Sequence, residues 1–215
     1  MTRQRPSLRR PQPHENVRGF PVFRIDERTT LWRLVRKGHG PWWYGSSLDG
    51  RFDLAPPHGT CYVANDDLGA ILETLGPDLL PGGLAPARLL RDRQLRAVRV
   101  PHAHRLANCL AQKAAKWITA EVGTLTPYEI PQAWAKAFHR GGFEGVRYGS
   151  RHLTSRRPYS VALFGSAGER SAWPKGRAVP LASDHRERLR RRCGVTLFDI
   201  PFEDELLFAK GPVAG

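Results

Sequence analysis

Cysteine is scarce in this sequence, and long apolar runs are absent. The three cysteines, Cys61, Cys109 and Cys193, are far apart and odd in number, so they offer neither a disulfide framework nor a Cys-x-x-Cys metal knuckle. Such sparse use favours a reducing compartment, and we expect a cytoplasmic protein. No stretch of about 18 apolar residues is present, which argues against a membrane-spanning helix. The basic N-terminus also lacks the apolar region of a secretory signal.

Several common nucleotide-binding and catalytic motifs are missing as well. No Gly-x-Gly-x-x-Gly follows a strand pattern, and no phosphate loop ends in Gly-Lys-Ser/Thr, so a doubly wound nucleotide-binding fold lacks support. The Gly-x-Ser-x-Gly turn of α/β-hydrolases is absent too. His102 and His104 could ligate a metal together with Cys109, but no fourth ligand stands at a familiar spacing. Surface histidines that precede a helix are the simpler interpretation, and we expect no metal.

The charge is strongly unbalanced, with 34 Lys and Arg against 20 Asp and Glu and a net charge of +14. Such an excess speeds association with anions such as nucleotides or nucleic acid, although a solvated arginine-rich surface explains the same numbers. The basic segment 186–192 has only Leu189 as an apolar anchor, and no known nucleic-acid reading module is visible. Any contact with nucleic acid is therefore expected to be non-specific.

The chain divides into three parts by composition. Residues 1–28 are rich in Arg and Pro and are expected to form a flexible tail, of which 20–25 could join the domain. Residues 29–200 are expected to form a single domain, and 201–215 a loose C-terminal tail. The length of 215 residues fits one domain of this kind.

Apolar periodicity predicts a mixture of strands and helices within the domain. Strands are expected at 29–35, 60–64, 95–100, 143–148, 159–164 and 195–200. Helices are expected after a cap at Asn65 or Asp66, with an apolar face at Leu68, Ile71, Leu72 and Leu75, and then at 105–117, 129–139 and 183–193. The aromatic, glycine-rich loop 38–49 is expected to be either a lid over a ligand or a flap that buries its tryptophans.

Four polar residues stand out between positions 31 and 73. Arg33 lies in an apolar strand and must find an anion or carbonyl partners, because an unpaired buried guanidinium is very costly; an ion pair with Glu73 is the structural alternative. Arg51 follows a turn glycine and suits a phosphate, or is an ordinary exposed turn residue. Tyr62 could stack on a flat ring or pack in the core. Glu73 lies in a largely apolar helix, where a carboxylate needs a partner or a catalytic role.

These residues resemble the RES domain, a family named for its arginine, glutamate and serine. The resemblance is carried by Arg33 in Leu-Trp-Arg, by Gly50-Arg51-Phe52-Asp53, by Gly59-Thr60-Cys61-Tyr62-Val63-Ala64 and by Glu73, and then by Gln132-Ala133-Trp134-Ala135 and the run 142–151. It covers about residues 31–164. Asp53 stands where asparagine is frequent. Pro131 stands where a small hydroxyl residue is common, so the family serine is assigned to Ser150.

The resemblance implies a fold and an activity. The fold would be a compact α/β (α+β) domain like that of ADP-ribosyltransferases, with a bent, split mixed sheet flanked by helices around an NAD cleft. Members are typically toxins of RES–Xre type toxin–antitoxin modules, with a helix-turn-helix antitoxin that blocks the cleft. They break the nicotinamide–ribose bond of NAD and pass ADP-ribose to water, phosphate or a protein. A non-catalytic basic nucleic-acid-binding module is the alternative from another class.

The resemblance also assigns roles to the residues. Glu73 would stabilise the charge that develops on the ribose, and Arg33, with Arg51, would hold the pyrophosphate. Tyr62 would stack on the nicotinamide, while Ser150 would hydrogen-bond the substrate or orient Glu73. The implied catalytic set is therefore Glu73, Arg33 and Ser150, with NAD as the substrate and no metal.

Overall fold

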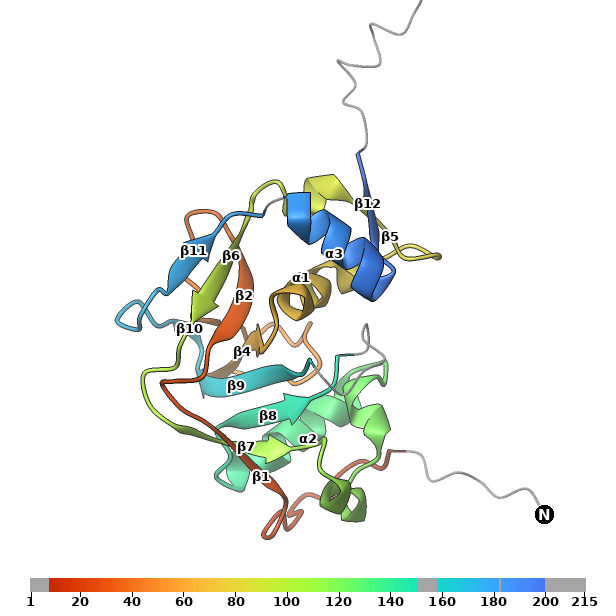
Figure 1. The fold of residues 1–215 in the computed structure, drawn as a ribbon. Helices are drawn as coiled ribbons and strands as arrows, with labels where there is room; N and C mark the ends of the chain where they lie inside the picture. The colour runs from red at the N-terminus through yellow and green to blue at the C-terminus, as the bar shows by residue number, and fades with distance from the viewer. Residues whose placement is uncertain (1–7, 151–157, 182, 200–215) are drawn as a thin grey trace, which may run out of the picture.

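The computed structural model describes residues 8–150, 158–181 and 183–199. The expected C-terminal tail, residues 201–215, lies outside the described residues. Within the described ranges the chain forms one large sheet, two small sheets and three α-helices (Figure 1).

The large sheet has eight strands in the order β1-β7-β8-β9-β4-β2-β6-β11. Strands β7 and β8 pair in parallel, and every other neighbouring pair in this sheet is antiparallel. The strands are β1 (Val22–Ile25), β2 (Leu31–Arg36), β4 (His58–Ala64), β6 (Arg93–Val98), β7 (His104–Asn108), β8 (Gly145–Tyr148), β9 (Ser160–Ser166) and β11 (Arg177–Val179). The small sheets pair β3 (Trp43–Tyr44) with β10 (Gly168–Glu169), and β5 (Leu84–Pro86) with β12 (Thr196–Phe198).

The large sheet is split between β2 and β4. Strand β4 pairs with β9 from His58 to Ala64, and β2 pairs with β6 from Leu31 to Arg36. By contrast, the ladder between β2 and β4 consists of the single pair Trp32 and Ala64. The two halves of the sheet therefore diverge on either side of this pair, which confirms the split mixed sheet expected from the sequence.

Three α-helices cover the sheet: α1 (Asp67–Leu75), α2 (Glu129–Arg140) and α3 (Ser183–Cys193). In Figure 1, α2 lies against the half that contains β8, while α1 and α3 lie on the half that contains β2. Four short 3-10 helices occupy connections: η1 (Gly76–Asp78), η2 (Ala87–Leu90), η3 (Gln112–Lys116) and η4 (Ala120–Gly123). No helix in the described ranges is long and apolar enough to cross a membrane.

Helix α1 forms where the sequence predicts it. The Asp66 carboxylate caps the helix by accepting a hydrogen bond from the Gly69 N–H at 3.0 Å, which satisfies one of the free N–H groups of the first turn. The residues of the predicted apolar face are all 1% exposed or less: Leu68, Ile71, Leu72 and Leu75. This face packs against β2 and fixes the helix over the split in the sheet.

The predicted helix at 105–117 is wrong. His104–Asn108 forms strand β7, which pairs with β1 on one edge and β8 on the other, and η3 follows at Gln112–Lys116. Leu106 and Ala107 are fully buried in this strand. The segment has good helix formers, but pairing on both edges satisfies its backbone groups and buries its apolar side chains, so tertiary context overrides a weak helix propensity.

Residues 8–19 pack on the domain instead of forming the expected flexible tail, and residues 20–25 join it, as the sequence allowed. Leu8, Val17 and Phe20 are 4%, 5% and 2% exposed, and β1 adds a strand to the edge of the large sheet. The Phe20 ring lies 4.7 Å from that of Phe138 and 5.3 Å from that of Trp117, measured between ring centroids. The domain therefore begins well before residue 29.

The aromatic loop buries one of its two tryptophans, as the expected flap would, and exposes the other. Trp42 and Tyr44 are 1% and 2% exposed, whereas Trp43 is 56% exposed. The Trp42 indole donates a hydrogen bond to the Pro174 carbonyl at 2.7 Å, and its ring packs at the edge of Trp173. The loop is thus held down by its own buried rings.

Replacing Phe20 with alanine tests the packing of the N-terminal segment. The change removes a buried ring from the contact with Phe138, so we expect the free energy of unfolding to fall by about 3–5 kcal/mol in urea titrations. Val22→Ala is the control on the same segment, because Val22 is 41% exposed, and it should cost less than about 1 kcal/mol. Equal stability of the two variants would show that the segment does not pack in solution.

Candidate functional site

A cavity of about 250 Å³ lies beside the single pair that joins β2 and β4. Its lining comes from β2, β4, β8, α1, η1, η4, the loop before β4 and the residue that precedes α2. The lining residues are Trp32, Arg33, Leu34, Asp49, Gly50, Arg51, Tyr62, Val63, Ala64, Ala70, Glu73, Thr74, Pro77, Gly123, Tyr128 and Tyr148. Four of the five residues predicted from the sequence, Arg33, Arg51, Tyr62 and Glu73, thus line one cavity.

The carboxylate of Glu73 is held by two hydroxyl groups. Ser160 Oγ donates to Glu73 Oε1 at 3.0 Å, and the Tyr148 hydroxyl donates to Oε2 at 3.4 Å. Burial and the nearby Glu73 charge raise the pKa of Tyr148 well above its usual value, so this phenol stays a donor. The half-buried carboxylate is therefore oriented by neutral groups, and its charge remains available to the cavity.

Arg33 has neutral partners. Its guanidinium donates to the carbonyl oxygens of Pro41 and of Trp43, the latter at 3.1 Å from Nη1, and lies 2.8 Å from the Cys61 sulfur. Carbonyl partners are one of the possibilities expected for Arg33 from the sequence. The alternative, an ion pair with Glu73, is not among these contacts. Hydrogen bonds to neutral groups fix the side chain without cancelling its positive charge.

Arg51 also keeps its charge at the cavity wall. It is 8% exposed, so it is not the exposed turn residue of the alternative interpretation. Its Nη1 donates to the Leu125 carbonyl at 3.4 Å, and its guanidinium carbon lies 4.9 Å from the centroid of the Tyr128 ring. Neither partner is an anion. A buried guanidinium with such partners is well suited to a phosphate or carboxylate ligand.

The turn that carries Arg51 is held by a glutamine from α2. Gln132 Nε2 donates to the carbonyl oxygens of Leu48 at 2.8 Å and Gly50 at 2.9 Å. A Cβ atom on Gly50 would lie 2.4 Å from Asp53 Oδ1 and 2.6 Å from the Tyr62 hydroxyl, so the close approach requires glycine. Gln132 belongs to the motif Gln132-Ala133-Trp134-Ala135, but this positioning role was not predicted from the sequence.

Tyr62 is tied to the same turn. Its hydroxyl donates to Asp53 Oδ1 at 2.8 Å and accepts from the Phe52 N–H at 2.8 Å. Burial, reinforced by the Asp53 carboxyl, raises the pKa of Tyr62 well above its usual value. Burial also raises the pKa of Asp53, against the opposing hydrogen bond from the Gly50 N–H. Tyr62 is therefore a neutral, oriented phenol at the cavity.

Ser160 is the serine that hydrogen-bonds Glu73 among the described contacts, and the role expected of Ser150 stays a prediction. Ser150 is 5% exposed and is not among the described residues that line the cavity; residues 151–157, which follow it, lie outside the described residues. Ser160 faces Tyr148 across the β8–β9 pair. Ser160 falls within the predicted strand 159–164, but the sequence does not reveal the pairing register, so this contact with Glu73 was not predicted.

Comparison with known proteins shows which family this chain belongs to. The family model of the RES domain matches residues 30–184, which is most of the chain, and no curated protein matches significantly. Among solved structures, a chain of the crystal structure of the M. tuberculosis MbcT–MbcA toxin–antitoxin complex is similar, with a TM-score of 0.59 and 13% identity. The match covers 78% of this chain and 92% of that one. The chain belongs to the RES domain family, and its fold is that of the similar structure.

Asp53→Asn tests the electrostatics of the turn. Because the folded-state pKa of Asp53 is raised above its ordinary value, the protonated form favours folding. That contribution is fully present below the unfolded pKa of about 3.9 and is lost as pH rises through the folded pKa. Asparagine cannot ionise, so the stability of the variant relative to the parent should increase over this rise in pH. Chemical unfolding at pH 4 to 8 measures it; a constant difference would contradict the assignment.

Proposed function

We propose that this protein consumes NAD by breaking the bond between nicotinamide and ribose and passing ADP-ribose to water or phosphate. The observation that carries the proposal is the Glu73 carboxylate, which two neutral hydroxyls orient at a cavity that is also lined by two arginines and by Tyr62. Membership of the RES domain family supports the same reading.

The reaction needs a carboxylate at this position. Loss of nicotinamide leaves positive charge on the ribose, in an oxocarbenium-like state of the kind that glycosidases stabilise. Glu73 supplies a fixed negative charge for that state and can accept a hydrogen bond from a ribose hydroxyl. Ser160 and Tyr148 act as positioning residues, because their hydrogen bonds to the carboxylate orient Glu73 toward the substrate.

The other cavity residues suit the rest of NAD. Arg51, and with it Arg33, would bind the pyrophosphate, since both guanidinium groups have neutral partners. The Tyr62 ring would stack on the nicotinamide. The cavity of about 250 Å³ falls below the usual range of ligand sites, about 300–1,000 Å³. It would therefore hold the nicotinamide and the ribose attached to it, with the adenosine half of NAD extending outside the cavity.

We further propose that the protein acts in the cytoplasm as the toxin of a toxin–antitoxin module. The similar structure is that of a toxin–antitoxin complex, and a cell would need an inhibitor to control an enzyme that depletes its NAD. The partner would be an antitoxin with a helix-turn-helix domain that covers the cavity. A protein side chain is an alternative acceptor of ADP-ribose at the same cavity, and its use would make the enzyme an ADP-ribosyltransferase.

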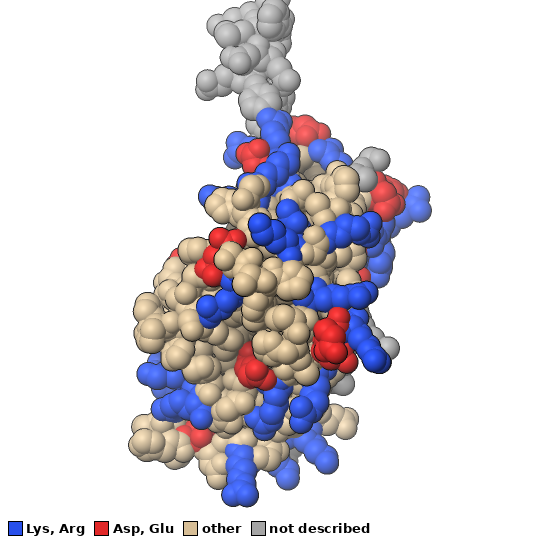
Figure 2. Space-filling view, turned by 90° about the vertical axis from the view of Figure 1, so that its left-hand side faces the viewer, with Lys and Arg blue, Asp and Glu red and all other residues tan. Residues whose placement is uncertain are grey.

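The charges on the surface give little support to the alternative of a basic nucleic-acid-binding module. Four of the five arginines of α3 pair with acids: Arg188 with Asp67 at 2.7 Å, Arg186 with Asp199 at 3.0 Å, Arg190 with Glu187 at 2.9 Å, and Arg191 with Glu187. On the face shown in Figure 2, Lys and Arg are scattered among acidic and neutral residues and form no continuous track. The basic helix therefore fits an ion-paired surface.

Glu73→Gln tests the catalytic assignment. Glutamine keeps the shape but removes the charge, so NAD consumption by the purified protein should fall about 100-fold or more, with the unfolding midpoint little changed. Glu27→Gln is the control, because Glu27 is exposed and outside the cavity. A Glu73→Gln protein that depletes NAD at the parental rate would refute the role of this carboxylate.

Ser160→Ala tests the positioning role. A hydrogen bond to a charged group is worth about 1.5–3 kcal/mol, so kcat should fall by about 10- to 100-fold if the bond persists in the transition state. KM should change little, because Ser160 would contact Glu73 rather than NAD. Ser160→Thr, which retains the hydroxyl, should recover part of the loss. An effect on KM alone would assign Ser160 to substrate binding instead.

A further inference from the structure

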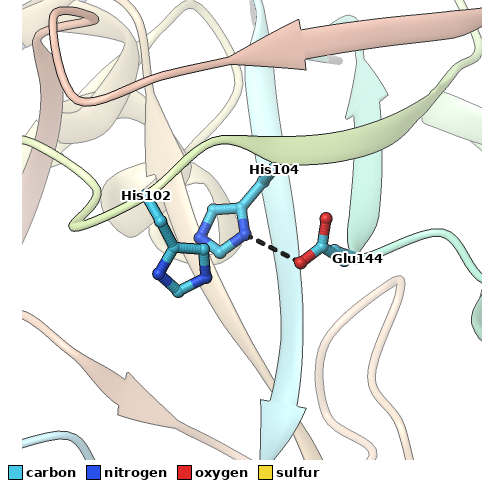
Figure 3. Close-up of side chains that lie close together, drawn as sticks. All are labelled: His102, His104 and Glu144. Carbon is cyan, nitrogen blue, oxygen red and sulfur yellow. Dashed lines mark hydrogen bonds and ion pairs between the residues drawn. The ribbon is translucent and has the colours of Figure 1, made fainter.

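Two histidines and a glutamate lie together at a second place in the molecule (Figure 3). His102 is in the connection between β6 and β7, His104 is the first residue of β7, and Glu144 directly precedes β8. One ligand atom of each lies within 4.8 Å of those of the other two. None of the three is among the described residues that line the cavity at Glu73. The cluster is therefore separate from the site proposed for NAD.

His104 does not fit the surface histidine expected from the sequence. Its side chain is 5% exposed, and its Nδ1 lies 3.2 Å from Glu144 Oε1. Glu144 Oε2 accepts the Arg105 backbone N–H at 2.8 Å, which fixes the carboxylate. An ionised carboxylate only accepts hydrogen bonds, so His104 Nδ1 carries the hydrogen, which in a neutral imidazole leaves the lone pair on Nε2.

That lone pair has no hydrogen-bond partner in the described structure. His104 Nε2 is buried and unsatisfied, and buried polar atoms in this condition are uncommon in folded proteins. A buried imidazole nitrogen without a partner calls for a cation or a hydrogen-bond donor at that nitrogen.

His102 stands on the correct side to share such a cation. Figure 3 shows the free nitrogen of His104 turned toward the His102 ring and away from Glu144, and the two ring centroids are 4.5 Å apart. Trp173 packs against both, nearly parallel to His104 at 5.9 Å and edge-on to His102 at 5.8 Å. His102 is exposed, so its ring can rotate and admit an ion from solvent.

We propose that His102 and His104 bind a divalent transition-metal ion of the zinc class, with Glu144 as the carboxylate that fixes His104. A metal-bound histidine almost always donates its other N–H to such a group, and imidazole suits zinc, copper and nickel. Two nitrogens on a tetrahedral zinc ion with bonds of about 2.0–2.1 Å lie about 3.3 Å apart, and the ring centroids of His102 and His104 are 4.5 Å apart, close enough for both rings to bind one ion. Water completes the coordination.

Zinc titration of the full-length chain, without a histidine tag and after chelator treatment, tests this site. Calorimetry should give one Zn²⁺ per chain, and the ion should raise the melting temperature, because it binds the folded state. His102→Asn, an exposed change, should weaken binding at least about 10-fold and remove the thermal shift. Glu144→Gln should weaken it about 10- to 100-fold, as the loss of an outer carboxylate does.

His58→Asn is the matched control, because His58 also lies beside a second imidazole, with its ring centroid 4.4 Å from that of His139. It should leave zinc binding unchanged. The proposal is overturned if the parental chain binds no stoichiometric zinc, if His102→Asn binds as tightly as the parent, or if the loss appears in His58→Asn instead. Binding is measured without NAD, so the result is independent of the proposed enzymatic activity.

Discussion

The contact on which the molecule depends is the single pair Trp32 and Ala64 between β2 and β4. On its other edge each strand pairs along its whole length, β2 with β6 and β4 with β9. Because the two halves of the sheet meet at one point, they diverge on either side of it, and the backbone leaves room for a cavity. Helix α1 covers the junction and carries Glu73 to its edge.

Electrostatics make this cavity more than a gap in the packing. The carboxylate of Glu73 is held by hydroxyls, and the guanidinium groups of Arg33 and Arg51 are held by carbonyl oxygens and a ring. Opposite charges line the same space without neutralising each other. Such an arrangement costs stability unless a ligand uses it, and it is typical of functional sites.

The sequence predicted the parts of the site that depend on local signals. The cap at Asp66 and the apolar spacing behind it identified α1, and the short apolar run 60–64 identified β4. The parts it missed depend on contacts between distant segments. Strand β7 exists because β1 and β8 pair with it, Ser160 reaches Glu73 through the register of β8 and β9, and Glu144 reaches His104 from a remote position in the chain. Local spacing carries no information on any of these.

Incubation of the purified protein with NAD tests the central claim most directly, with and without phosphate and with chromatographic analysis of the products. The account predicts release of one nicotinamide for each NAD lost, with ADP-ribose formed in plain buffer and its phosphorylated form when phosphate is the acceptor. Intact NAD after prolonged incubation with folded protein would contradict it, as would cleavage at the pyrophosphate, which would yield nicotinamide mononucleotide.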